Sequence, residues 1–292
     1  MKINAYIMAA DPAWIENSVL SYYDKIEKLV VSYDENSTSW TGERLDVEQC
    51  LRRLKAIDSK GKMVFAPGHY ARLNHEPMEN DTYQRQCALE EAAPGADWVI
   101  QFDTDEVMAD PDEFFSCLRE ADEKGFSALN YPSRWLYKRI GYRHYLEQCS
   151  RFWRTVGAYP GPMAIKNGTH LKLARQTEAP SFYVDFRFKS TDFSGPPDTV
   201  VHRVIKSEQA IMHYSMVRSE KELRHKTKAW SHSNDRNWNP EIERWVWSGR
   251  HPLLAMLVTP LVRNSSTRRR LRVARIAPPV AALRKYSTPS SK

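Results

Sequence analysis

Hydrophobic positions follow two alternating patterns over the first 131 residues. Runs of consecutive apolar residues, as expected for buried strands, occupy positions 3–8, 29–33, 63–66, 98–102 and 126–131. Between these runs, apolar residues recur every three or four positions, as Val47, Leu51 and Leu54 do, which is typical of one face of a helix. This regular alternation predicts an α/β fold in which helices cover both faces of a mostly parallel sheet.

Two of the predicted helices have recognisable boundaries. The helix between the third and fourth apolar runs is expected to begin near Asp81, with Tyr83 and Cys87 facing the sheet. The helix after the fourth run is expected over 111–124, because Asp110 is a good N-cap and a proline follows it.

The pattern changes after about residue 132. Apolar and other residues alternate at 182–188, and glycine and proline turns separate short segments, which predicts short and mostly antiparallel strands. We therefore divide the chain into a first part over 1–132, a second part over 133–232, and a C-terminal helical extension with a basic tail over 233–292.

Acidic residues follow directly where apolar runs end. Asp103, Asp105 and Glu106 come after the fourth run, and Asp34 ends the second. Residues i and i+2 of a strand project to the same side, so the carboxylates of Asp103 and Asp105 can converge on a hard cation such as Mg²⁺ or Mn²⁺ bound to a diphosphate. The alternatives are a solvated acidic turn for the first group and an Asx turn for Asp34.

A second polar cluster begins at His213, which closes another apolar strand pattern. Ser219 and Glu222 then form a capping box for a helix. Arg218 and Lys226 lie on either side of this helix start, where a diphosphate would gain charge-assisted hydrogen bonds. The alternative for His213 is a structural, hydrogen-bonded histidine.

Charge is distributed unevenly along the chain. The 292 residues carry a formal charge of +7, but nine basic and no acidic residues lie at 263–292, which leaves −2 on the preceding residues. A nucleic-acid-binding domain should carry basic charge on its docking face rather than on a tail. We therefore expect no nucleic-acid partner.

Cysteine usage and hydropathy predict a cytoplasmic protein. The four cysteines lie far apart and form no C-x-x-C pair, which argues against a zinc site and a disulfide framework. No apolar run approaches the roughly 20 residues that span a membrane, and no signal-peptide core occurs near Met1.

The order of these features resembles a known family. Five strands, with Asp34 after the second and Asp103-Thr104-Asp105-Glu106 after the fourth, resemble the nucleotide-binding half of a GT-A glycosyltransferase of the family-2 type. The later segment is similar to the histidine segment of related GT-A enzymes, through His213-Tyr214, Arg218, Ser219, Glu222 and Lys226. The resemblance covers roughly residues 1–232, and it implies that 1–132 are the nucleotide-sugar-binding half and 133–232 the acceptor-side half. It implies a Rossmann-like, mostly parallel sheet, an antiparallel acceptor-side region and C-terminal helices.

The same resemblance implies an activity and roles for individual residues. It implies metal-dependent transfer of a sugar from a nucleotide diphosphate donor, UDP-linked being favoured, to an acceptor hydroxyl. Asp34 and Asp103 would contact the nucleotide, while Arg218 and Lys226 would bind its diphosphate. Mn²⁺ or Mg²⁺ would be held by Asp103, Asp105 and His213 and would neutralise the leaving diphosphate.

One part of the family pattern is missing. Many inverting members carry a Glu-Asp pair that supplies the catalytic base, and no such pair occurs between Tyr131 and His213. Asp185 and Asp192 are the candidates for this catalytic role. Asp192 lies in a predicted loop, where functional residues are common, whereas a solvated strand face is the alternative for Asp185.

Two other functions fit parts of the sequence. Residues 103–107 also match the D-x-D-x-V nucleophile motif of haloacid-dehalogenase-type phosphatases, although that motif normally follows the first strand and a later G-D-x-x-x-D is absent here. A non-catalytic module that binds sugar nucleotides is favoured if the carboxylates of Asp103 and Asp105 do not converge.

The C-terminal region admits two interpretations. An apolar run at 252–262 precedes six arginines at 263, 268, 269, 270, 272 and 275, an order expected of an interfacial anchor on the cytoplasmic face of an anionic membrane. In the alternative, Leu253, Leu257 and Leu261 pack a terminal helix on the core.

Overall fold

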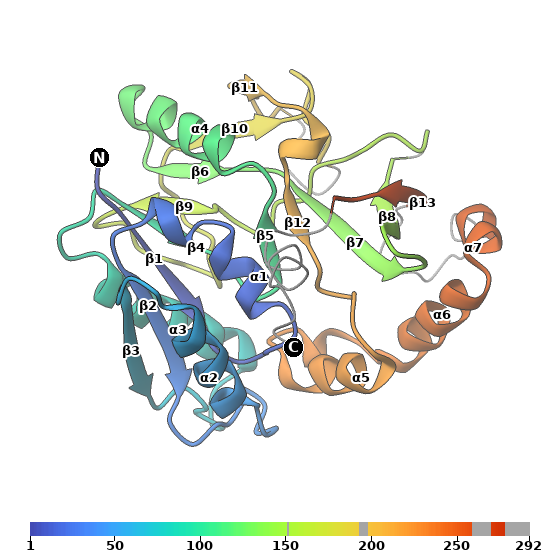
Figure 1. The fold of residues 1–292 in the computed structure, drawn as a ribbon, viewed down its shortest axis with the longest axis horizontal. Helices are drawn as coiled ribbons and strands as arrows, with labels where there is room; N and C mark the ends of the chain where they lie inside the picture. The colour runs from blue at the N-terminus through green and yellow to red at the C-terminus, as the bar shows by residue number, and fades with distance from the viewer. Residues whose placement is uncertain (151, 193–197, 259–269, 278–292) are drawn as a thin grey trace, which may run out of the picture.

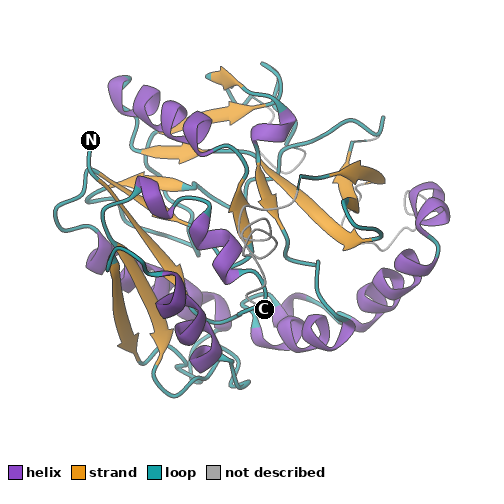
Figure 2. Ribbon diagram, in the orientation of Figure 1, coloured by secondary structure: helices purple, strands orange, loops and turns teal. Residues whose placement is uncertain are grey.

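The computed structural model describes residues 1–150, 152–192, 198–258 and 270–277 (Figures 1 and 2). Its strands are β1 Ile3–Met8, β2 Leu29–Asp34, β3 Met63–Gly68, β4 Trp98–Gln101, β5 Glu106–Met108, β6 Ala128–Asn130, β7 Ser133–Arg139, β8 His144–Cys149, β9 Ala164–Lys166, β10 Ser181–Asp185, β11 Arg203–Val204, β12 Ile211–His213 and β13 Arg270–Arg275. Its helices are α1 Ile15–Leu20, α2 Val47–Ile57, α3 Pro77–Ala92, α4 Pro111–Glu123, α5 Glu220–Ala229, α6 Asn239–Arg250 and α7 Pro252–Val258.

The larger sheet has the strand order β11-β10-β6-β9-β4-β1-β2-β3. Strand β1 runs parallel to both β2 and β4, and β2 runs parallel to β3. Strand β9 is antiparallel and lies between β4 and β6, while β10 is parallel to β6. The predicted α/β fold with a mostly parallel sheet is confirmed.

Side chains alternate between the two faces of this sheet, as the period of two in a strand requires. In β1, Ile7 packs in a core formed with α1, α2 and α4, whereas Tyr6 faces the smaller core beneath α3. In β2, Val31 packs in the first of these cores and Val30 in the second. Helices therefore cover both faces, as the alternating pattern predicts.

Strand β1 lies between β2 and β4, so the chain leaves β1 toward one side of the sheet and later returns to its other side. The loops that follow β1 and β4 consequently diverge. In open α/β sheets such a reversal of strand order opens a crevice at the carboxyl ends of the strands, where ligands bind.

A second sheet, with the order β13-β8-β7-β12-β5, comes mainly from the later part of the chain. The β7–β8 and β8–β13 pairs are antiparallel, which confirms the predicted antiparallel region. The prediction is wrong for β10, which joins the larger sheet in parallel, and for β12, which pairs in parallel with β7. Side-chain alternation identifies a strand but does not encode the direction of its partner. The larger sheet contains strands from before and after residue 132, so the sheet does not mark a boundary there. The division of the chain into functional parts at residue 132 stays a prediction.

Helix α3 differs from its prediction. It begins at Pro77, four residues before the predicted start, and Tyr83 is 42% exposed. Its buried face instead includes Asp81, Gln84 and Arg85. These polar side chains line a cavity beside the sheet.

The C-terminal segment is only partly helical. Helices α5, α6 and α7 follow one another along one side of the molecule (Figure 1). The predicted basic tail is wrong over 270–275, which form β13, and Arg272 donates to the buried Glu147 of β8 at 2.6 Å. Arginines 263, 268 and 269 lie outside the described residues.

Helix α7 does not pack its leucines on the core. Leu253 and Leu257 are 70% and 64% exposed, and Ala255 is the buried residue of this helix. The third leucine of the predicted stripe, Leu261, lies outside the described residues. None of the described helices is both long enough and apolar enough to cross a membrane.

Candidate functional site

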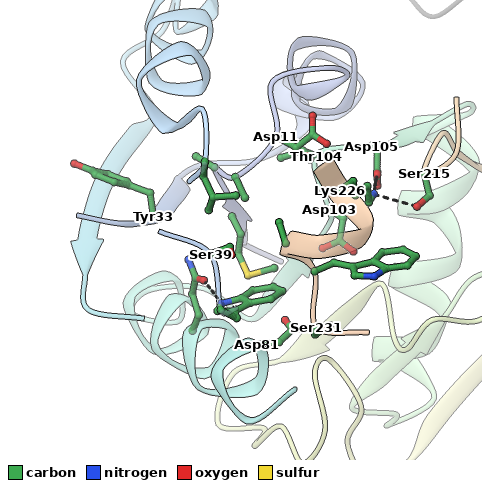
Figure 3. Close-up of a pocket in the computed structure, with 18 of the residues that line it drawn as sticks. Asp11, Tyr33, Ser39, Asp81, Asp103, Thr104, Asp105, Ser215, Lys226 and Ser231 are labelled. Atoms are coloured by element: carbon green, nitrogen blue, oxygen red, sulfur yellow. Dashed lines mark hydrogen bonds and ion pairs between the residues drawn. The ribbon is translucent and has the colours of Figure 1, made fainter. Parts of the chain in front are cut away.

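A cavity of about 340 Å³ opens at the crevice described above. It is lined by Asp11 after β1, by Asp34 at the end of β2 and by the segment Asp103–Asp105 after β4. Side chains of α3 and α5 complete the wall (Figure 3). Its volume lies in the range of small-molecule sites in proteins.

The turn after β4 holds the acidic cluster in place. Glu106 N donates to the carbonyl of Asp103 at 3.1 Å, and Asp103 N donates to the Glu106 carboxylate at 2.9 Å. Strand β5 then pairs antiparallel with β12, so that Glu106 lies opposite His213. This pairing brings His213 Nε2 within 3.3 Å of Asp105 Oδ1, although more than a hundred residues separate them in the chain.

Asp105 is surrounded by cations. Its Oδ2 accepts from Lys226 Nζ at 2.5 Å and from Arg218 Nη2 at 2.6 Å. Lys226 also donates to Ser215 Oγ at 3.0 Å, and Figure 3 shows Lys226 between these two partners. Burial alone would raise the pKa of Asp105, but Lys226, His213 and Arg218 together hold it well below its ordinary value. Asp105 is therefore ionised and already neutralised within the chain.

Asp103 has a separate set of partners. Arg85 Nη2 donates to its Oδ1 at 2.9 Å, and Arg175 Nη2 lies 3.4 Å from its Oδ2. Burial opposes ionisation of Asp103, but Arg85 and Arg175 outweigh that effect and lower its pKa. The Asp103 side chain keeps 27% exposure and faces the cavity.

Arg85 and Arg175 each contact a second carboxylate, which is buried. Arg85 Nε donates to Asp81 at 2.6 Å. Arg175 binds Glu106 through both terminal nitrogens, at 2.5 and 2.8 Å, and is 2% exposed. Gly161 allows this close approach, because a Cβ there would lie 2.6 Å from Arg175 Cγ. The floor of the cavity is thus a chain of alternating charges.

A divalent cation does not fit this arrangement of Asp103, Asp105 and His213. Asp103 and Asp105 share no partner among the described side chains, and both oxygens of Asp105 already contact cations or His213. Within the described residues, no three His, Cys, Asp or Glu side chains are grouped so as to hold a metal ion. The sequence pattern placed the carboxylates correctly at a strand end, but it did not reveal the basic side chains that face them.

Asp34 lines the cavity, and its carboxylate accepts hydrogen bonds from four backbone amides. Its Oδ2 accepts from the amides of Tyr70 and Ala71, and its Oδ1 accepts from those of Asn36 and Thr38, all at 2.9–3.1 Å. These bonds fix two loops at the cavity rim. Its expected contact with a nucleotide stays a prediction.

Replacing Asp34 tests this structural role. We expect Asp34→Ala to lower the free energy of unfolding by about 2 kcal/mol, because four backbone amides, that of Tyr70 buried, would lose their acceptor. Urea denaturation measures the change. Glu43→Ala, an exposed change in the same loop, should stay within about 0.5 kcal/mol of wild type. Equal stability of the two variants would contradict the role given to Asp34.

The structure does not bring Asp185 and Asp192 to the cavity. Neither residue lines it. Asp185 is 1% exposed, and its carboxylate accepts from Thr191 N and Thr191 Oγ1, both at 2.6 Å, so it holds the loop that follows β10. The carboxylate that a catalytic base would require at the cavity is not supplied by this part of the chain.

Four buried charged residues of the site were missed from the sequence, namely Asp81, Arg85, Glu106 and Arg175. The spacing of Asp81 and Arg85, four residues apart on a helix, was a usable signal for an ion pair. Glu106 was noted only as the third acidic residue. Arg175 lies between strands in a segment without a pattern, so nothing local indicated its burial.

Comparisons with known proteins add little to this geometry. No family model and no curated protein matches the chain. Many solved structures resemble parts of it, among them the following three. The first, 4-diphosphocytidyl-2C-methyl-D-erythritol synthase from Anaerococcus prevotii, is 12% identical, with 57% of this chain and 70% of that one covered and a TM-score of 0.34.

The other two likenesses span about half of the matched chains. CMP:2-keto-3-deoxy-manno-octonic acid synthetase complexed with CTP is 16% identical, with coverage of 46% of this chain and 53% of that one and a TM-score of 0.31. Mannose-6-phosphate isomerase from Helicobacter pylori is 11% identical, with coverage of 49% and 53% and a TM-score of 0.30. At these scores the likenesses do not identify the activity of this chain.

Proposed function

We propose that this chain binds a nucleotide diphosphate sugar in the cavity and transfers the sugar to an acceptor hydroxyl. The position of the cavity carries the proposal. It opens where the strand order reverses, at the carboxyl ends of β1, β2 and β4, which is where nucleotides bind in sheets of this kind. Lys226 reaches the same cavity and is suited to the oxygens of a diphosphate.

Aromatic side chains support a ligand with a base or a sugar ring. Tyr33, Trp40, Trp135 and Trp230 all line the cavity. The indole N–H of Trp40 donates to Gln84 at 2.8 Å, which fixes the orientation of that ring. Flat aromatic faces stack on bases and on the apolar faces of sugars. A UDP-linked donor remains the first candidate, as the GT-A resemblance implies.

A second candidate is a non-catalytic module that binds sugar nucleotides. It is favoured by the separate partners of Asp103 and Asp105 and by the distance of Asp185 and Asp192 from the cavity lining. The phosphatase alternative finds less support. Its nucleophile would be Asp103, and both carboxylate oxygens of that residue face arginines.

A ligand screen tests the proposed function. We expect at least one of UDP, GDP, ADP, CDP and dTDP, or the corresponding sugar nucleotides, to raise the melting temperature of the full chain, because a ligand that binds only the folded state stabilises it by mass action. The diphosphates should act at concentrations at which the free nucleosides do not. Absence of a shift with every nucleotide would contradict the proposal.

A turnover assay separates the two candidates. A transferase should release nucleotide diphosphate from the sugar nucleotide identified by the screen, slowly toward water and faster with a panel of glycans or glycolipids. The binding module should be stabilised by the same ligand and release none.

A further inference from the structure

Four basic side chains face the carboxylates of Asp103 and Asp105, and they differ in their second partners. Arg85, Arg175 and Arg218 each bridge two carboxylates, since Arg85 also reaches Asp81, Arg175 reaches Glu106 and Arg218 lies 2.8 Å from Asp11. The second partner of Lys226 is the neutral hydroxyl of Ser215. Within the described part of this cluster, Lys226 is therefore the cation that is not shared between two carboxylates.

Within the described residues, Lys226 also has a donor that makes no hydrogen bond, and its Nζ lies 5.7 Å from the centre of the Trp230 ring. An ammonium group has three N–H donors, and Asp105 and Ser215 account for two of them. Its side chain is 19% exposed and lines the cavity, whereas the Arg218 side chain is 1% exposed. A ligand entering the cavity can therefore reach Lys226 before it reaches the arginine behind it.

The same side chains oppose a metal ion at Asp105. A divalent cation bound to either oxygen of Asp105 would lie within a few ångströms of Lys226 and Arg218, and like charges so close repel strongly in a partly buried site. It would also have to displace the 2.5 Å contact of Lys226. Asp105 serves as the counter-ion that orients Lys226.

We infer that Lys226 takes the place of the divalent cation, so that the site binds the diphosphate of its nucleotide without Mn²⁺ or Mg²⁺. The inference rests on the proposed function. Asp105 and Ser215 hold the ammonium at the cavity wall, and its third N–H donates to a diphosphate oxygen. The charge-assisted bond supplies the attraction that a bound metal would otherwise give.

Calorimetric titration of the nucleotide diphosphate panel into the full chain tests this inference, in EDTA and again with Mn²⁺. Wild type should bind with the same affinity in both conditions. Lys226→Met should weaken binding in EDTA by about tenfold or more, as expected for loss of a hydrogen bond to a charged group. Lys226→Arg should retain most of the affinity, because it keeps the charge.

A readout without nucleotide tests the same point from the metal side. Mn²⁺ alone should leave the melting temperature of wild type unchanged. A rise would show that the site binds the metal although Lys226 is present, which would contradict the inference. Lys228→Met, two residues along α5 and outside the cavity lining, should behave as wild type in both experiments. Circular dichroism confirms that each variant folds.

The possible failures are distinguishable. Wild-type binding that disappears in EDTA and returns with Mn²⁺ would overturn the role of Lys226 and leave the proposed function standing. Equal affinity of wild type and Lys226→Met in EDTA would do the same. Absence of binding by every nucleotide, with or without Mn²⁺, would overturn the proposed function and this inference together.

Discussion

Asp105→Asn is expected to lower the free energy of unfolding by about 3 kcal/mol or more. The substitution removes the charge that compensates Lys226 and Arg218, and breaking one side of a buried ion pair leaves an uncompensated charge behind. Urea denaturation at neutral pH measures the loss.

The pH dependence of stability provides a check on the same residue. The pKa of Asp105 lies well below the value of about 3.9 expected in the unfolded chain. Below that value the unfolded state binds more protons, so the contribution of Asp105 is present above about pH 4 and is lost as the pH falls toward the folded-state pKa. Asp105→Asn should show a shallower loss of stability over this range than wild type. Parallel curves would contradict the assignment.

Arg175→Met is expected to lower the free energy of unfolding by about 3–5 kcal/mol, which is similar to the loss expected for Asp105→Asn. The guanidinium is 2% exposed and binds the fully buried Glu106 through two nitrogens, so its removal leaves a carboxylate without a counter-charge in the protein interior. Arg175→Lys should have an intermediate effect, because a lysine keeps the charge but cannot donate the two parallel bonds. Urea denaturation of the three proteins gives this order directly.

A double substitution separates the ion pair from a general packing defect. Adding Glu106→Gln to Arg175→Met should cost much less than the sum of the two single changes, because residues in direct contact are energetically coupled. Arg154→Met, on an exposed arginine, should change stability by no more than about 0.5 kcal/mol. Additive losses in the double variant would show that the pair has no special role.

The sequence predicted the framework of this molecule well. The apolar runs at 3–8, 29–33, 63–66 and 98–102 became β1 to β4. Strands β1, β2 and β4 are almost wholly buried, and buried parallel strands leave a continuous apolar signature. Strand-end carboxylates such as Asp103 and Asp105 could also be located, since the end of an apolar run marks the edge of the sheet. The order of apolar and polar segments along the sequence was therefore sufficient to predict these strands and the position of the carboxylates.

The neighbours of those carboxylates could not be predicted. Arg85 lies on a helix face that a hydrophobic pattern assigns to solvent, and it is buried only because the cavity and Asp103 lie beside it. Arg175 and Gly161 meet through a close contact between two irregular segments, and such contacts carry no periodicity. Charge pairing across a fold depends on tertiary distances, which one sequence does not contain.

The position of β13 in the chain has a consequence for the growing polypeptide. Strand β8 can pair with β7 as soon as both have been synthesised. Its other neighbour, β13, is synthesised much later, since Arg270 of β13 pairs with Cys149 of β8 and lies 121 positions after it. At a synthesis rate of roughly 5–20 residues per second, the open edge of β8 waits about 6–24 seconds for its partner. During that interval its free amides and carbonyls can pair with strands of other nascent chains. Slow translation over the second half would lengthen that interval, which makes aggregation during synthesis sensitive to codon choice downstream of β8.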